Sequence, residues 1–146
     1  LAVIAATRAI ADRLRAVAMP PLVSVAGAAE LEAVRDGTAP ESGACYVIPW
    51  SEEPRPSRTL GAHWQPVSIS VLTAVCIRTY EDGTGEAYLA EAETVLGALK
   101  TALAGWTPDP ADLLPIDYGG TRASQLAGVG TYWLVSAWST SRQLFN

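Results

Sequence analysis

The sequence predicts an α+β fold, in which a mostly antiparallel or mixed sheet of about four to five strands carries two main helices on one face. The first observation is the segment 66–77, where β-branched residues alternate with smaller or polar ones, which indicates a strand with one face on a core. The second is the segment 87–106, whose apolar residues recur at helical spacing: Leu89, Ala92, Leu96, Leu99 and Leu103. A strand and a helix with one apolar side each predict a sheet covered by helices.

The length and composition favour a single domain, 1–146, that associates with other protein surfaces. The chain has 146 residues, of which only 17% are charged, whereas globular domains average about 25%. Few charges and five tryptophans leave apolar surface to cover, which favours oligomerisation. The net charge of −5 and a single lysine, Lys100, argue against general or sequence-specific binding of nucleic acid.

The N-terminal part predicts two helices and two short strands. Residues 2–18 form the first helix, which a Pro-Pro pair ends because proline cannot continue the hydrogen-bond ladder. Charged residues interrupt this segment, so we expect neither a signal peptide nor a membrane span, and a soluble protein. A short strand over 22–26, a short helix over 27–36 and a strand over 44–50 follow. Pro49 marks the last strand as an edge or as the end of the pairing.

Residues 51–65 break every periodicity and predict a loop of about 15 residues, far longer than the usual connection of about 4–6. Because strands flank it on both sides, we expect the arm of a long hairpin that projects from the body. Its charged residues lie close together in sequence: Glu52, Glu53, Arg55 and Arg58. Such mixed charges fit inter-subunit ion pairs and also fit a solvated loop; the length of the loop and Trp64 at its end favour the interface.

The C-terminal part predicts a helix stop, a linker and two further strands. Gly105 ends the long helix, and residues 109–114 form a turn-rich linker. A strand over 115–121 contains Gly119-Gly120, which suggests a bulge or a close backbone approach. The last strand, 131–140, is apolar on both faces. It is therefore either central to the sheet or covered by a partner subunit.

No arrangement of residues in the sequence indicates catalysis, a cofactor or a metal. His63 is the only histidine and lies beside a tryptophan in a polar loop, without a partner that could orient it as a base. The Gly-Thr-Gly at 83–85 lacks the remaining features of a phosphate-binding loop. Cys45 and Cys76 each lie in a strand candidate and are expected to be buried free thiols, with a disulfide between them as the alternative.

The order of the elements resembles that of the phage tail terminator proteins of long-tailed bacteriophages and related prophages. The resemblance covers about residues 3–142 and is carried by three stretches: ACYVIPW at 44–50, VLGALKTALAGWTP at 95–108 and PIDYGGTRASQLAGVGTYWLVSAWSTS at 115–141. The most specific features are the strand that ends near a proline, the helix that ends in Leu-Ala-Gly-Trp-Thr-Pro, and the Tyr-Gly-Gly strand before the aromatic one.

The resemblance implies a structural virion protein with no enzymatic activity and no cofactor. Such a protein forms a homo-hexameric ring that caps the head-proximal end of the tail tube, ends its polymerisation and joins it to head-tail connector or neck proteins. DNA can pass through the ring. The place of the protein would be the tail or neck of the virion, after assembly in the host bacterial cytoplasm.

The resemblance also places ring contacts on projecting hairpins and sheet edges. In this chain they map onto 51–65 and the neighbouring strand ends. The candidate interface residues are Glu52, Glu53, Arg55, Arg58, His63, Trp64, Tyr118, Arg122 and Trp133.

Three other functions stay open. The chain could be another neck or tail-completion subunit, since these proteins share small α+β folds. It could be a non-catalytic module that binds a small molecule or a protein, with a pocket lined by Trp64, Tyr118, Tyr132 and Trp133. It could also be a monomeric adaptor, for which the sequence offers no positive feature.

Overall fold

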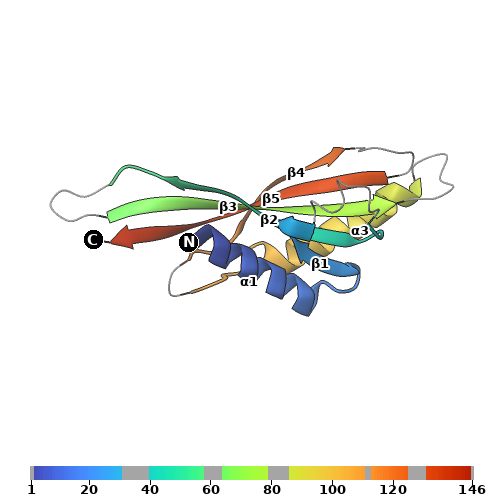
Figure 1. The fold of residues 1–146 in the computed structure, drawn as a ribbon, viewed down its shortest axis with the longest axis horizontal. Helices are drawn as coiled ribbons and strands as arrows, with labels where there is room; N and C mark the ends of the chain where they lie inside the picture. The colour runs from blue at the N-terminus through green and yellow to red at the C-terminus, as the bar shows by residue number, and fades with distance from the viewer. Residues whose placement is uncertain are drawn as a thin grey trace.

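The molecule contains a five-stranded mixed sheet, as predicted, and its strand order is β1-β2-β3-β5-β4 (Figure 1). The computed structural model describes residues 2–30, 40–57, 64–78, 86–110, 113–124 and 131–145. The strands are β1 Ser24–Gly27, β2 Ala44–Pro54, β3 Trp64–Arg78, β4 Asp117–Ser124 and β5 Thr131–Phe145, and the two main helices are α1 Ala2–Val17 and α3 Glu86–Leu103. β1 runs parallel to β2, and all other neighbours are antiparallel.

The predicted strand over 66–77 is the central strand β3. It pairs with β2 on one side and with β5 along its whole length on the other. Its alternating apolar residues are almost fully buried on the face that the helices cover: Val67, Ile69, Val71, Val75 and Ile77. Burial of each such side chain contributes about 1.5–3 kcal/mol relative to exposure.

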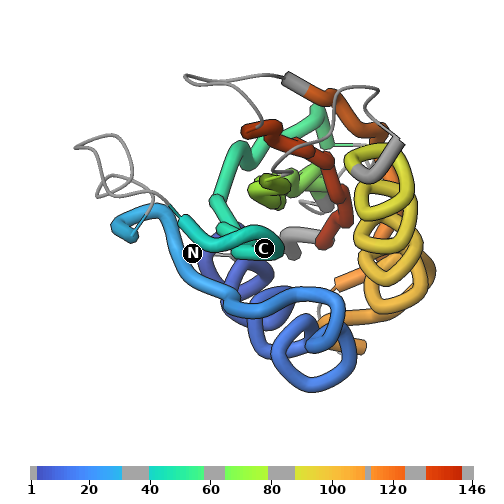
Figure 2. Tube along the Cα trace, turned by 90° about the vertical axis from the view of Figure 1, so that its right-hand side faces the viewer, coloured from blue at the N-terminus to red at the C-terminus, as the bar shows by residue number. Residues whose placement is uncertain are grey.

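Helices α1 and α3 cover the same face of the sheet, and Figure 2 shows them next to one another around the strands. Ile10 and Leu14 of α1 and Leu99 and Leu103 of α3 are each at most 1% exposed in one continuous core. Leu89, predicted to face this core, is instead 63% exposed. The buried stripe of α3 is the neighbouring one: Tyr88, Ala92, Val95, Leu99 and Ala102. The two stripes share residues, so helical spacing alone does not separate them.

The predicted loop over 51–65 is shorter than expected, because β2 continues through Pro54 and β3 begins at Trp64. The N–H of Arg55 still donates to the Pro66 carbonyl oxygen at 2.9 Å. The strand passes Pro49 through a register shift, a bulge at Trp50. Charged residues that suggest a loop are also usual on an edge strand. β2 and β3 therefore pair antiparallel on either side of this segment, and residues 58–63 between them lie outside the described residues.

The glycine pair in the fourth strand forms the predicted bulge. The register between β4 and β5 shifts between Tyr118 and Thr121, and Gly120 has φ +106°. A Cβ on Gly119 would lie 3.2 Å from the carbonyl oxygen of Ala137, so the backbones also approach closely there. β4 covers 117–124 instead of 115–121.

The last strand is central, which is the first of the two predicted alternatives. β5 lies between β3 and β4 and extends to Phe145, past the predicted end at residue 140. The strand predicted over 22–26 is β1, Ser24–Gly27. Residues 28–30 are helical, and the rest of the helix expected over 27–36 lies outside the described residues. No helix in the described ranges is long and apolar enough to span a bilayer.

The two cysteines are free thiols on opposite faces of the sheet, so the alternative of a disulfide between them is wrong. Cys45 packs in the core under the helices, whereas Cys76 packs with Tyr46 and Trp133 on the other face. Burial raises the pKa of the Cys45 thiol to about 12. This thiol is therefore a small core side chain.

Replacement by alanine is expected to change the free energy of unfolding in opposite directions at two glycines, one in α3 and one just after it. Gly105 has φ +77°, where a Cβ is strained, so Gly105→Ala should lower the free energy of unfolding by about 1–2 kcal/mol. Gly97 is an exposed helical residue with no atom within 4 Å of a built Cβ, so Gly97→Ala should raise it by about 0.5–1 kcal/mol. Urea unfolding of both variants checks this; equal signs would contradict it.

Candidate subunit interface

The outer part of β2 is an open sheet edge. β1 pairs only with Ala44–Val47, so residues 48–54 have β3 on one side and no strand among the described residues on the other. Trp50, the bulge residue, is 66% exposed here, beside the exposed carboxylates of Glu52 and Glu53. We name residues 48–54 the β2 edge. Sequence reasoning did not select Trp50; its signal was a tryptophan next to a proline in an edge strand.

Glu52 links the β2 edge to the start of α1. Its Oε1 accepts a hydrogen bond from the Val3 N–H at 3.1 Å, and the first turn of α1 has no acidic residue of its own. A carboxylate at this end of a helix satisfies an unpaired N–H and interacts favourably with the helix dipole. Glu52 therefore also has a role within the chain.

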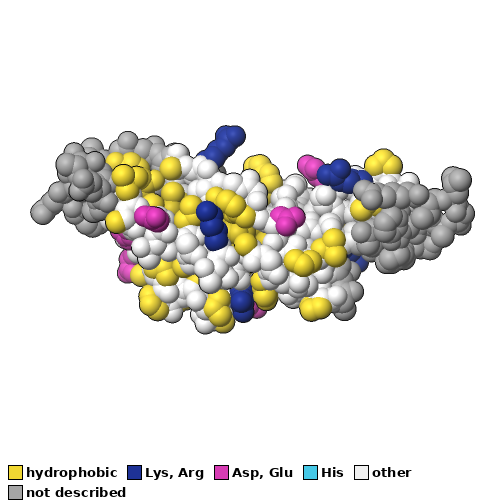
Figure 3. All heavy atoms as spheres, turned by 180° about the vertical axis from the view of Figure 1, so that it is seen from behind, with side chains coloured by type: hydrophobic (Ala, Val, Ile, Leu, Met, Phe, Trp, Pro, Cys, Tyr) yellow, Lys and Arg dark blue, Asp and Glu magenta, His cyan; other side chains and the backbone are white. Residues whose placement is uncertain are grey.

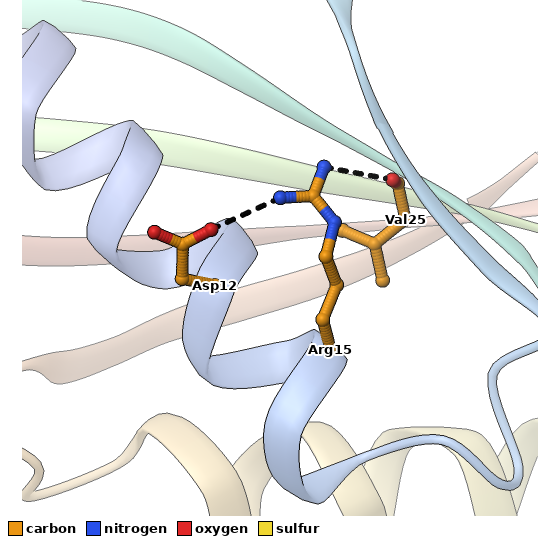
Figure 4. A network of polar contacts seen from close by, with 3 residues as sticks. All are labelled: Asp12, Arg15 and Val25. Atoms are coloured by element: carbon orange, nitrogen blue, oxygen red, sulfur yellow. Dashed lines mark hydrogen bonds and ion pairs between the residues drawn. The ribbon is translucent and has the colours of Figure 1, made fainter.

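The short strand β1 receives a side-chain contact from α1 at its main chain. Arg15 of α1 donates from Nη2 to the Val25 carbonyl oxygen at 3.0 Å and from Nη1 to Asp12 Oδ1 at 3.1 Å (Figure 4). This contact occupies one main-chain acceptor of β1. The open part of this side of the sheet is thus the β2 edge.

The opposite side of the sheet ends in β4, which has β5 on one side and no further strand among the described residues. Tyr118 is 36% exposed at this β4 edge, and its ring centroid lies 5.2 Å from that of Trp138. The Tyr118 hydroxyl bonds to Thr121 Oγ1, and Lys100 Nζ lies 4.8 Å from the Tyr118 ring centroid. This edge thus presents a fixed aromatic ring with a cation above it.

The structure places the remaining predicted interface residues unequally. Arg55 is exposed next to the β2 edge, with its Nε 3.4 Å from Ser68 Oγ, and Arg122 is exposed on β4. Trp133 is only 5% exposed, because it packs against Tyr46 on the face away from the helices. Arg58 and His63 lie outside the described residues, as does the side chain of Trp64. The exposed candidates among the described residues therefore belong to two separate surfaces, the β2 edge and the β4 edge, on opposite sides of the sheet.

Two of the four residues considered for an aromatic pocket, Tyr132 and Trp133, lie on opposite faces of the sheet. Tyr132 lies on the helix-covered face and stacks on Tyr88 with ring centroids 4.1 Å apart, whereas Trp133 lies on the opposite face. Adjacent residues of a strand point to opposite faces, so these two cannot line one cavity.

A shallow groove of about 310 Å³ between α1 and α3 is lined by Arg13, Val17, Gly97, Ala98, Thr101 and Ala102. Arg13 already lies over the Trp106 ring and donates to the Ala102 carbonyl oxygen. No three His, Cys, Asp or Glu side chains of the described residues come together in a way that could hold a metal ion.

The surface drawn in Figure 3 carries several hydrophobic patches, and only a few charged side chains lie among them. Such a surface agrees with the low charge content of the sequence. It is typical of a chain that covers apolar area by association.

A family model described as phage tail terminator protein matches residues 2–141. The chain belongs to the phage tail terminator family. As a member, it is a structural protein of the phage tail, and its place is the tail of the virion.

The fold of this tail terminator protein is similar to that of a chain in the structure "Virion of native gene transfer agent (GTA) particle". The TM-score is 0.60 at 16% sequence identity, and the similarity covers 94% of each chain. At this identity the likeness concerns the fold. A search among curated proteins gives no match.

Proposed function

We propose that this protein forms a homo-hexameric ring that caps the head-proximal end of the tail tube, ends tube polymerisation and joins the tail to head-tail connector or neck proteins. The ring has no catalytic role, and DNA passes through it. Its partners are other copies of the chain, the tail tube protein and the neck proteins. Membership of the family supports this proposal.

The observation that carries the ring is the presence of two unlike open edges on opposite sides of one sheet. The β2 edge has an exposed tryptophan and carboxylates, whereas the β4 edge has Tyr118 and Lys100. A ring uses heterologous contacts, in which one surface of each copy meets a different surface of the next. A two-fold dimer would instead bring the same surface together twice.

The first experiment measures the mass of the purified protein by light scattering and images the same fractions by negative stain. We expect rings of uniform diameter, alone or after addition of purified tail tubes, and one ring at one end of each tube. Tubes that stay uncapped and continue to grow with the protein present would overturn the proposal. Binding of neck proteins without capping would favour another tail-completion subunit.

The arm at 51–65 is expected to contribute to this assembly. Replacing Arg55 and Arg58 together by Glu should weaken ring formation by about 10-fold or more, because the two side chains lose their inter-subunit ion pairs and the new carboxylates repel the acidic groups that formed them. The folding of the single chain should not change, since Arg55 is exposed. Arg8→Glu, which makes the same kind of substitution once on the exposed side of α1, is the control. Unchanged assembly of the double variant would exclude the arm from the contact.

A further inference from the structure

We propose that neighbouring copies meet β2 edge to β4 edge, with Trp50 of one copy packed on Tyr118 of the next. In the same contact, Glu52 of the first copy faces Lys100 of the second. The occupant of each edge is thus a second copy of this chain. The inference rests on the proposed ring and goes further, because it names the two surfaces and the register between them.

The pairing of the strands places the two aromatic residues at the same height in the sheet. Pro49, next to Trp50, pairs with Val71; Val71 pairs with Trp138; and Trp138 pairs with Tyr118. In the proposed ring, one copy is related to the next by rotation about an axis that runs along the strands. Such a rotation does not change the position of a residue along the strand direction, which is here called its height. It therefore brings the bulge at Trp50 beside Tyr118 of the next copy.

The direction of the strands also fits this contact. Three successive antiparallel pairings separate β2 from β4, so the two edge strands run in opposite directions. Side by side they form one more antiparallel pair, which is the arrangement of β3 with β5. The contact would also satisfy the unpaired N–H and C=O groups that make an open edge prone to aggregation.

Trp50 and Tyr118 are suited to form the centre of the contact between two copies. Trp50 is 66% exposed, and tryptophan and tyrosine are enriched among the residues that dominate interface energy. Tyr118 is held in place by the Trp138 ring and by the hydrogen bond of its hydroxyl with Thr121, so little side-chain freedom is lost when a partner packs on it.

Charge complementarity supports the same pairing. The register puts Glu52 opposite Ile69 on the helix-covered face, and Lys100 lies over the Tyr118 ring on that face. Glu52 is two strand positions from the height of Tyr118, about 7 Å, which is within reach of a lysine side chain. The pairing of Glu52 with Lys100 favours this heterologous contact over a contact between two β2 edges, whose carboxylates would repel one another.

Disulfide trapping in the full chain tests the register. With Ser51→Cys and Asp117→Cys together, which lie at one height through Ser70 and Ser139 and leave Trp50 and Tyr118 in place, the assembled protein should show a ladder of cross-linked copies on a non-reducing gel. The matched control is Ser51→Cys with Arg122→Cys, which moves the second thiol along the same edge to the height of Val135 and should not cross-link. The native cysteines do not interfere, since both are buried.

Single substitutions test the anchor. Trp50→Ala should weaken association by about 30-fold or more, as expected for a central interface tryptophan, and leave the thermal unfolding of the single chain unchanged. Leu89→Ala removes an equally exposed hydrophobic residue away from both edges and should leave association unchanged.

The two proposals fail in different ways. Rings that form without cross-links between Ser51→Cys and Asp117→Cys, or with equal cross-links in the control pair, would overturn the edge contact and leave the capping function standing. If the unmodified protein does not form rings or cap tubes, the proposed function itself fails.

Discussion

Replacing Trp138 by alanine is expected to lower the free energy of unfolding by about 3–5 kcal/mol, the usual cost of removing a buried tryptophan. Trp138 lies in the middle of β5 and is 1% exposed in the core beneath the helices. Its Nε1–H donates to Thr73 Oγ1 at 2.9 Å, and its ring supports Tyr118. The variant therefore loses packing and also leaves the buried Thr73 hydroxyl without this partner.

Urea unfolding of Trp138→Ala, Trp138→Phe and Thr73→Val separates these contributions. Thr73→Val leaves the indole N–H unsatisfied and should cost about 1–3 kcal/mol. In the Trp138→Phe background the same change should cost less, because no indole N–H is left to satisfy. A loss of under about 1 kcal/mol in Trp138→Ala would show that this side chain does not pack in the core as described.

Stability is expected to fall as the pH rises above about 9, in part because of Cys45. Burial raises the pKa of this thiol from 9.0 to about 12 in the folded chain. The folded state thus keeps a proton that the unfolded state releases, so the stabilisation is complete below pH 9 and is lost as the pH rises toward 12. The loss is about 1.4 kcal/mol for each pH unit in this window.

Comparison with Cys45→Ala isolates this contribution. Burial also raises the pKa values of Cys76, Tyr46 and Tyr88, but these groups are present in both proteins and largely cancel in the difference. The difference in unfolding free energy between the wild type and Cys45→Ala, measured from pH 8 to 11, should shrink as the pH rises. A difference that stays constant would show that Cys45 is not protected from ionisation by burial.

Local sequence patterns predict the positions of some interface candidates correctly and of others wrongly. Charged residues in an aperiodic stretch drew attention to Glu52, Glu53 and Arg55, and the structure places them on or beside an open edge. Trp50 is not among the predicted interface residues, because the proline before it indicates the end of a strand. Trp133 was selected for its aromatic character, yet it is buried by Tyr46 from a distant part of the chain.

The sequence by itself determined the elements and several of their details. Alternation in β3, helical spacing in α1 and α3 and the irregularity at Gly119-Gly120 follow from the local spacing of residue types, which leaves two places for β5, the centre of the sheet or a position under a partner subunit.

The tertiary structure decided which edges stay open and what they display. β1 covers only part of β2, and the register sets Trp50 and Tyr118 at one height on opposite sides of the sheet. Strand order and register are set by pairings between residues far apart in the chain. Because such pairings depend on the packing of the whole core, no local pattern in the sequence encodes them.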